Sequence, residues 1–210
     1  TGRIICHQLQ QTDADFSDCA DVVAFMRQTS DVAVLPPQTK QRVGDLENLP
    51  PDLLGDIAVV VFVAGSGSKT GPEKTVAVDQ NGAMALIDLA RDSGVRHFVM
   101  LSAKGAEDPE NARESIRHYM RAKRAADDHL MASGLSYTIC RPVSLSNEAG
   151  TGRVSLAKSV DPSGELARED LADVLIDAMT HSALQNCVVE LGPGSTPIDV
   201  AIATYSVTDC

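Results

Sequence analysis

The sequence predicts an α/β fold of the doubly wound type, in which a largely parallel sheet lies between two layers of helices. Three observations lead to this class. Short apolar runs alternate with segments of helical periodicity, which is the pattern of successive βαβ units. The run at residues 57–64 is continuously apolar, as expected of a strand covered on both faces. The 210 residues also suit one compact unit, so we expect a single domain over residues 1–210.

The expected strands are short runs rich in β-branched and aromatic residues. They lie at residues 21–26, 57–64, 97–101, 136–140 and 187–191. Arg27, Ser102 and Arg141 each follow one of these runs directly. Because ligands of such sheets bind beyond the carboxyl ends of the strands, we expect these side chains beside a ligand site.

The expected helices carry apolar residues three and four positions apart. They lie at residues 4–11, 81–91, 115–132 and 171–178. Gly94 and Gly134 follow the second and third of these segments and are suited to helix ends. The first helix is the weakest, because residues 12–18 are polar and rich in residues that stop helices. Strands and helices in this order imply right-handed crossovers.

Composition narrows the class of partner. Acidic residues outnumber basic ones 29 to 18, and the net charge of −11 disfavours nucleic acid and anionic membranes. No apolar run reaches the ~20 residues of a membrane span, and no secretory signal opens the chain. The cysteines form no CxxC pair and the histidines show no metal-ligand spacing. We therefore expect a cytoplasmic protein, monomeric or homodimeric, with reduced thiols and no metal site.

A tyrosine and a lysine four residues apart, Tyr119 and Lys123, carry the strongest chemical signal. In a helix this spacing places both side chains on one face. An ammonium beside a phenol favours the phenolate, so Lys123 is expected to lower the pKa of Tyr119 from its usual ~10. A phenol so poised can exchange a proton with a carbonyl or an alcohol. The same spacing also arises by chance, so the surrounding motifs decide its meaning.

The first residues look like the tail of a glycine-rich dinucleotide loop whose preceding strand is missing. The first strand of a doubly wound sheet lies at its centre, and its loss leaves two neighbouring strands with unpaired backbone groups. We therefore expect that roughly ten residues, including this strand, lie outside the sequence. Thr1 as the authentic start is the alternative.

Several segments, taken in order, resemble one family. They are TGRI at residues 1–4, VVAFMR at 22–27, VGDL at 43–46, VFVAGSG at 61–67, VDQNGAMALIDLA at 78–90, GVRHFVMLSAKGA at 94–106 and HYMRAKRAADDHLMASGLSYTICRP at 118–142. The chain resembles an atypical member of the short-chain dehydrogenase/reductase superfamily. The branch is that of small NAD(P)-binding proteins related to NAD-dependent epimerases/dehydratases, biliverdin-IXβ/flavin reductases and nitrogen-metabolite-repressor-like sensors. The resemblance implies a Rossmann-like, three-layer α/β/α fold.

The resemblance also implies a cofactor site. The pyrophosphate would lie against Thr1, Gly2, Arg3 and Ile4, and a 2′-phosphate against Arg27. The adenine would lie beside Asp45 and Leu46, with Ala64, Gly65 and Ser66 beneath the ribose and nicotinamide. Lys123 would bind the ribose hydroxyls, and Pro142 and Val143 would lie beside the nicotinamide. Arg27, with no acidic residue at that strand end to hold a free 2′-hydroxyl, favours NADP over NAD.

The catalytic set implied by the resemblance is Ser102, Tyr119 and Lys123, with Tyr119 shuttling the proton and Ser102 holding the substrate oxygen. The expected function is therefore an NADP-dependent oxidoreductase acting on a small carbonyl, alcohol or sugar-like substrate, and epimerase or dehydratase chemistry would use the same residues. Two departures favour a non-catalytic NAD(P)-binding sensor or assembly factor instead. Ala103 replaces a second hydroxyl residue, and Ile5 replaces the last glycine of the loop. A third alternative is an incomplete pocket that binds nothing.

Overall fold

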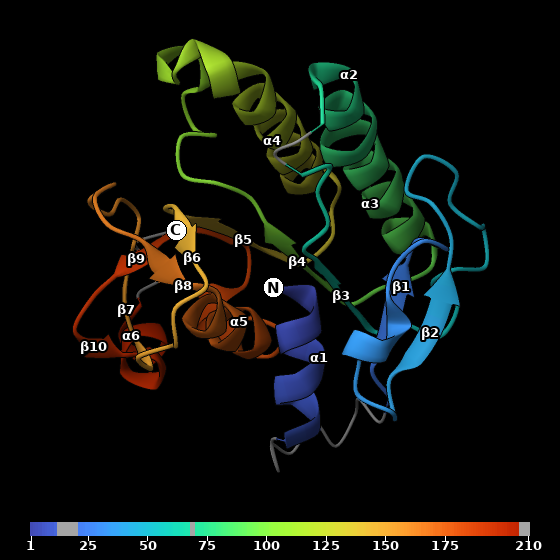
Figure 1. Cartoon of the computed structure of the whole chain (residues 1–210), viewed down its shortest axis with the longest axis horizontal. Helices are drawn as coiled ribbons and strands as arrows, with labels where there is room; N and C mark the ends of the chain where they lie inside the picture. Colours follow the sequence, from blue (N-terminus) through green and yellow to red (C-terminus); the bar gives the residue numbers. More distant parts are fainter. Residues whose placement is uncertain (12–20, 68–69, 206–210) are drawn as a thin grey trace.

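The computed structural model describes residues 1–11, 21–67 and 70–205. The polar segment at 12–18, together with Cys19 and Cys210, lies outside these residues. The described chain forms helices on both faces of a central sheet, which confirms the predicted α/β class (Figure 1).

The central sheet has six strands in the order β10-β7-β9-β5-β4-β3. Their bounds are β3 Val59–Phe62, β4 His97–Leu101, β5 Tyr137–Pro142, β7 Arg153–Ala157, β9 Cys187–Pro193 and β10 Thr196–Pro197. β3, β4, β5 and β9 are parallel, whereas β7 and β10 add an antiparallel edge. The four parallel strands are those that the apolar runs predicted.

Two further pairs of strands lie outside this sheet. β1 (Val23–Met26) pairs in parallel with β2 (Lys40–Val43), and β6 (Leu145–Ser146) pairs in parallel with β8 (Leu166–Ala167). The sheet is therefore split between β1 and β3 rather than continuous, as Figure 1 shows. That a further strand belongs in this split stays a prediction.

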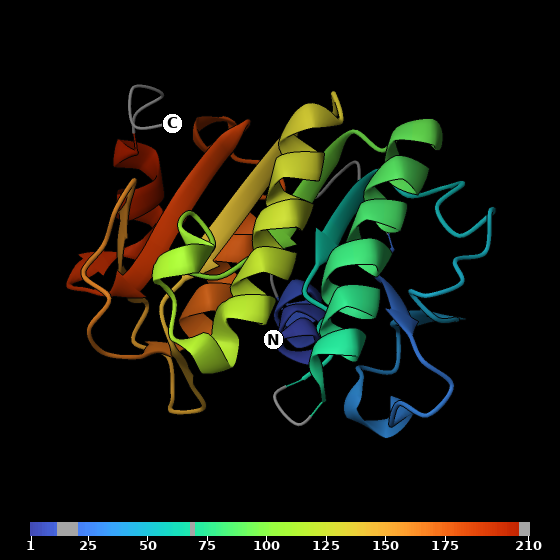
Figure 2. The same ribbon diagram turned by 90° about the horizontal axis from the view of Figure 1, so that it is seen from above.

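The helices are α1 Gly2–Gln11, α2 Pro72–Thr75, a π-helix at Val76–Gly82, α3 Ala83–Asp92, α4 Glu114–Ala132, α5 Arg168–Asp177 and α6 Ile198–Thr204. Short 3₁₀ turns lie at Val32–Val34, Pro109–Asn111 and Ser182–Leu184. α3 and α4 lie side by side over one face of the sheet, and α1 and α5 pack together on the other (Figures 1 and 2). The helix expected at 81–91 thus begins earlier, as a π-helix.

Successive residues of the central strands supply both cores. Phe98 and Met100 of β4 join Ile87 of α3 and Leu130 of α4 on one face. Val99, between them, joins the cluster built around α1, α5 and α6 on the other face. Because both faces of a parallel sheet are covered, the strands read as continuous apolar runs, which is why the sequence revealed them.

Among the described cysteines, Cys6 and Cys140 are free and buried, and burial raises the pKa of the Cys140 thiol to about 12. Cys187 is disulfide-bonded, so the expectation of uniformly reduced thiols is wrong at this position. In the part of the chain that the structure describes, no helix is long and apolar enough to cross a membrane.

Candidate cofactor and active site

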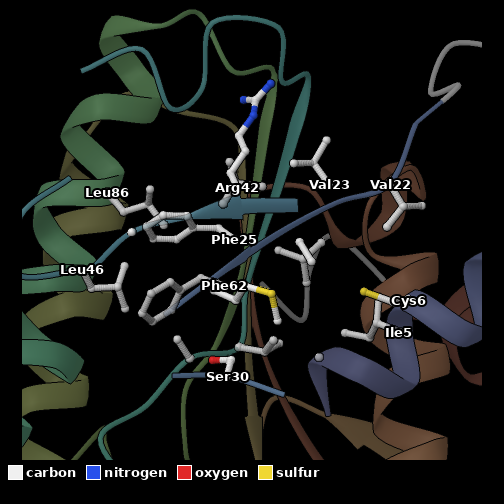
Figure 3. Close-up of a pocket in the computed structure, with 18 of the residues that line it drawn as sticks. Ile5, Cys6, Val22, Val23, Phe25, Ser30, Arg42, Leu46, Phe62 and Leu86 are labelled. Carbon is white, nitrogen blue, oxygen red and sulfur yellow. The ribbon is translucent and has the colours of Figure 1, made fainter. Parts of the chain in front are cut away.

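A cavity of about 1670 Å³ lies at the split in the sheet. Residues of β1, β3 and α1 line it, together with residues of the loops that follow the two strands. Figure 3 shows Phe25, Phe62, Leu46 and Ile5 among the side chains that surround the space. The walls between the strands are thus mainly apolar, whereas the ends carry polar and charged groups.

Most of the residues expected at a cofactor line this one cavity. They are Gly2, Arg3, Arg27, Asp45, Leu46, Ala64, Gly65 and Ser66. They come from α1, from the ends of β1 and β3, and from the turn after β2. The carboxyl ends of the strands have therefore brought together segments that are far apart in the sequence, as the fold class predicts.

The amino end of α1 lies against the end of β3. A Cβ placed on Gly2 would lie 3.1 Å from the Val63 side chain, so the helix and the strand end are in close contact here. Burial lowers the pKa of the Thr1 amino group, and the nearby charges of Arg168 and Arg3 lower it further. Ile4 packs against the core and Ile5 is buried in it, so the bulky residue at position 5 serves packing.

Arg27 follows β1 and is exposed. Its guanidinium forms no ion pair with any residue in the described ranges, although Lys40, Arg42 and Lys74, which line the same cavity, all have acidic partners. A cation left without a carboxylate at a cavity mouth is available to an anionic ligand.

Asp45 forms a turn. Its carboxylate accepts a hydrogen bond from the Glu47 backbone N–H (3.1 Å), and its carbonyl accepts one from the Asn48 N–H. Leu46 in this turn touches the π-helix, because a Cβ on Gly82 would lie 2.9 Å from the Leu46 Cβ. Asp45 thus forms a turn, and this turn places Leu46 at the wall of the cavity.

The loop after β3 is held by Asp79 of the π-helix. The Ser66 backbone N–H donates to Asp79 Oδ2 over 2.9 Å. Gly65 passes so close that a Cβ there would lie 2.9 Å from Asp79 Oδ1. Position 65 therefore needs glycine because the carboxylate occupies the space of a side chain.

Lys123 is almost fully buried, with 3% of its surface exposed. Its Nζ donates to the Leu101 carbonyl over 3.0 Å and lies 3.6 Å from Asp79 Oδ1. It also lies 5.7 Å from the centre of the Tyr119 ring, so α4 brings the pair together on one face as predicted. Burial lowers the pKa of Lys123, while Asp79 and Asp127 oppose that effect.

The pKa of Tyr119 is raised rather than lowered. Burial is the main cause, and the charges of Asp79 and Asp127 add to it. The expectation that Lys123 brings this pKa toward neutrality is therefore wrong for the structure as it stands, because two carboxylates and desolvation outweigh one ammonium. The phenol consequently keeps its proton at neutral pH.

Ser102 also differs from its expected arrangement. Its hydroxyl donates to Asp127 Oδ2 over 2.9 Å, and the side chain is buried. Arg141 donates to the same carboxylate through Nε (3.0 Å) and Nη2 (2.9 Å). The hydroxyl proton that would hold a substrate oxygen is thus already used, and Ser102 instead belongs to a buried Ser–Asp–Arg network.

Pro142 ends β5 and Val143 follows it, and neither is among the residues that line the cavity. The Pro142 carbonyl accepts from the Lys104 N–H (2.9 Å), and the Val143 N–H donates to the Leu191 carbonyl (2.8 Å). Lys104 in turn forms a 2.5 Å ion pair with Glu190, which is 5% exposed. Backbone and side-chain bonds therefore hold the loop after β4 against the carboxyl ends of β5 and β9.

Sequence reasoning missed Asp79, Asp127 and the role of Arg141. Asp127 stands four residues after Lys123, so the helical spacing that paired Tyr119 with Lys123 could have found it. Asp79 stands between the apolar residues 76–78 and the polar residues Gln80 and Asn81, so its local pattern does not mark it as functional. In the described ranges, no three His, Cys, Asp or Glu side chains are grouped so as to hold a metal ion.

The fold and this site define a class of protein, a Rossmann-like nucleotide-binding domain in which a partly buried tyrosine and a buried lysine form a pair beside the cavity. Residues 1–182 match the NAD(P)H-binding family, and the chain belongs to that family.

The chain is also similar to individual proteins with sequences or structures that are known. The chain is 43% identical over 143 residues to the uncharacterized sugar epimerase YhfK of Bacillus subtilis, and the match covers 68% of this chain and 66% of that protein. It is similar to the solved structure of a putative NAD-dependent epimerase/dehydratase from Bacillus halodurans, with a TM-score of 0.83, 34% identity and 87% of each chain covered. It is also similar to the oxidoreductase ylbE from Lactococcus lactis, with a TM-score of 0.82, 25% identity, and 97% of this chain and 90% of that chain covered. The family resemblance and the Rossmann-like fold are confirmed.

Proposed function

We propose that this protein is an NADP-dependent oxidoreductase that interconverts a small carbonyl compound and its alcohol, with sugar-like molecules as one substrate class. The observation that carries the proposal is the Tyr119–Lys123 pair, which Asp79 joins to the loop at residues 64–66 on the cavity wall. The names of two relatives, an epimerase and an oxidoreductase, support the same class of chemistry.

The residues around the cavity fit a dinucleotide. Two glycines of the cavity lining leave no room for a side chain. A side chain at Gly65 would meet Asp79, and one at Gly44 would meet the Phe25 ring. The unpaired guanidinium of Arg27 suits a 2′-phosphate, which supports NADP over NAD. The amino end of α1 offers free backbone N–H groups to the pyrophosphate.

The cofactor, when bound, supplies or accepts a hydride, and the protein handles the proton. At neutral pH the Tyr119 hydroxyl carries a proton, which it would donate to a carbonyl oxygen. Lys123 and its bond to the Leu101 carbonyl fix the position of the charge beside that ring. We assign Ser102 to the support of Asp127 and not to the substrate, because its hydroxyl proton is engaged there.

Calorimetric titration with NADPH and NADH tests the cofactor assignment. We expect NADPH to bind at least about tenfold more tightly than NADH, and Arg27→Ala to remove most of that difference, because a charge-assisted bond to phosphate contributes ~1.5–3 kcal/mol. Arg96→Ala is the matched control, since Arg96 is exposed and lies at the opposite ends of the strands. Equal affinities for the two cofactors, or a loss on Arg96→Ala as large as on Arg27→Ala, would contradict the NADP assignment.

The alternative is a sensor or assembly factor that binds NAD(P) without turnover. The engaged hydroxyl of Ser102, the missing hydroxyl at Ala103 and the raised pKa of Tyr119 favour it. A panel of aldehydes, ketones and keto-sugars distinguishes the two. Consumption of NADPH with any of them supports the enzyme, whereas tight binding without consumption across the panel supports the sensor.

We further propose a small-molecule partner, because the net charge of −11 disfavours nucleic acid and anionic membranes, and a monomer or homodimer. Light scattering coupled to size exclusion measures the oligomeric state directly, and a higher oligomer would contradict this part of the proposal.

A further inference from the structure

Asp79 is the one described side chain whose carboxylate meets both the loop after β3 and the buried lysine of α4. One oxygen, Oδ2, accepts from the Ser66 N–H at 2.9 Å. The other, Oδ1, lies 3.6 Å from Lys123 Nζ and fills the space beside Gly65. Only 1% of the surface of Asp79 is exposed, so water hardly solvates the charge of this carboxylate.

The charges around Asp79 balance in pairs. Asp79 faces Lys123, and Asp127 faces Arg141, all four being nine-tenths buried or more. A buried ion that loses its partner is strongly destabilised, so Asp79 and Lys123 are each held in place by the other. Any displacement of the loop at Ser66 therefore acts on Lys123 through a shared carboxylate.

The backbone that carries Asp79 reinforces this link. The π-helix Val76–Gly82 packs against α4, and Gly82 at its end touches Leu46 in the turn that lines the cavity. Short π-helical segments are rare, and they occur frequently at functional sites. This one aims Asp79 between the cavity loop and the catalytic helix.

We propose that Asp79 is a positioning residue that couples the cofactor loop at residues 64–66 to the Tyr119–Lys123 pair. Its Oδ2 fixes the loop, and its Oδ1 fixes the ammonium beside the tyrosine. The carboxylate acts through these two groups and touches no reacting atom itself. The inference rests on the proposed function for the role of the pair, but its physical content can be measured without cofactor or substrate.

Two variants separate the two halves of the coupling. Asp79→Asn keeps an oxygen that can accept from Ser66 but removes the charge. Asp79→Ala removes both. The charged or titratable groups that face Tyr119 are Asp79 from the π-helix and Lys123 and Asp127 from α4, so loss of the Asp79 charge must lower the pKa of the phenol.

The first measurement is phenolate absorbance as pH rises. The chain has three tyrosines and no tryptophan, so tryptophan does not contribute to this absorbance. The part of the absorbance change that is lost in Tyr119→Phe is assigned to Tyr119. We expect that part to appear at lower pH in both Asp79 variants. Asp92→Asn, an exposed acid at the end of α3, is the control and should leave it unchanged.

The second measurement is hydrogen exchange at the Ser66 amide. We expect exchange about tenfold faster in Asp79→Ala and near the parental rate in Asp79→Asn, because only the first loses the acceptor. The Thr151 and Gly152 amides, which donate to Asp170, provide an internal reference that should not move.

If Asp79→Ala does not fold, the double variant Asp79→Ala/Lys123→Met removes both members of the buried pair and is compared with Lys123→Met alone. Unchanged Ser66 exchange on loss of Asp79, or unchanged titration of Tyr119 in the Asn variant, overturns the coupling. Because neither readout involves a cofactor, these results stand whether or not the protein oxidises or reduces anything.

Discussion

At the scale of single residues, the chemistry depends on a phenol, that of Tyr119, which is partly buried and close to two carboxylates. Tyr119 lies over Lys123 on α4, but Asp79 and Asp127 flank the same ammonium. The raised pKa of Tyr119 makes it a weak acid in the ligand-free protein. A positive charge bound near these carboxylates would offset their effect and lower the pKa of the phenol.

We expect Tyr119→Phe to reduce turnover of any active carbonyl substrate by roughly 10²–10⁴-fold, because a positioned proton donor contributes that much. NADPH affinity should change little, since the hydroxyl meets substrate and not cofactor in the proposed arrangement. The measurement is steady-state NADPH consumption beside a calorimetric titration of the same variant. Tyr137→Phe is the control, because Tyr137 opens β5 at the opposite end of the strand. Turnover in Tyr119→Phe within a factor of two of the parent would exclude Tyr119 as the donor.

At the scale of elements, α5 carries an acidic row that the fold holds together. Burial raises the pKa of Asp173 to about 6, and the nearby Asp170, Asp177 and Glu169 contribute. Asp170 is engaged, because it accepts from the Thr151 and Gly152 amides, so it cannot move away from Asp173. The apolar face of the helix and its hydrogen bonds to the loop at residues 150–152 stabilise the fold, whereas repulsion between its carboxylates destabilises it.

This repulsion has a defined pH dependence. The pKa of Asp173 in the folded state is above its usual value of 3.8, so the folded chain binds more protons than the unfolded chain between the two values. Stability from this group is therefore complete below about pH 4 and is lost as pH rises through about 6.

We accordingly expect Asp173→Asn to raise the free energy of unfolding at about pH 7.5 by ~1 kcal/mol, a value reduced for solvent screening because the side chain is half-exposed. Near pH 4 the two proteins should have similar stability, since the aspartate is then largely protonated. Urea unfolding at both pH values measures the difference. Asp52→Asn, an exposed acid, should show neither effect. A gain that is the same at both pH values would contradict this origin.

At the scale of the whole molecule, the split sheet is the dominant feature. β1 is paired only with β2, and β3 only with β4, among the described strands. The other edge of each strand faces the apolar part of the cavity (Figure 3). Unpaired strand edges and exposed apolar walls are both unfavourable, so the space between them suits one further parallel strand. α1 begins at the carboxyl end of β3, so a strand in that space could enter α1 through a short loop.

We expect a chain extended before Thr1 by a five-residue β-branched strand and a short glycine-containing loop to unfold about 10 °C higher. Burying several such side chains contributes ~3–5 kcal/mol, and each kcal/mol raises the melting temperature of a domain of this size by ~2–4 °C. The same extension with lysine at alternate positions is the control and should give no gain. Thermal unfolding followed by circular dichroism measures both. Equal melting temperatures for the two extensions would mean that the space is not a strand site.

The sequence by itself determined the class of fold, the parallel strands β3, β4, β5 and β9, and the helical pairing of Tyr119 with Lys123. Each is a local pattern, because a doubly covered strand must be apolar throughout and a spacing of four must share a helical face. It did not reveal β2, whose residues Lys40–Val43 are mostly exposed and polar, or the two-residue strand β10, which is too short for a pattern.

Only the tertiary structure decided the electrostatics of the site and the course of the sheet. The pKa of Tyr119 depends on Asp79, which arrives from a different helix, and on the depth at which α4 is buried. The engagement of Ser102 depends on Asp127 and Arg141, which come from α4 and β5. Desolvation and charge coupling act between atoms close in space whatever their separation along the chain, so no local pattern in the sequence encodes them.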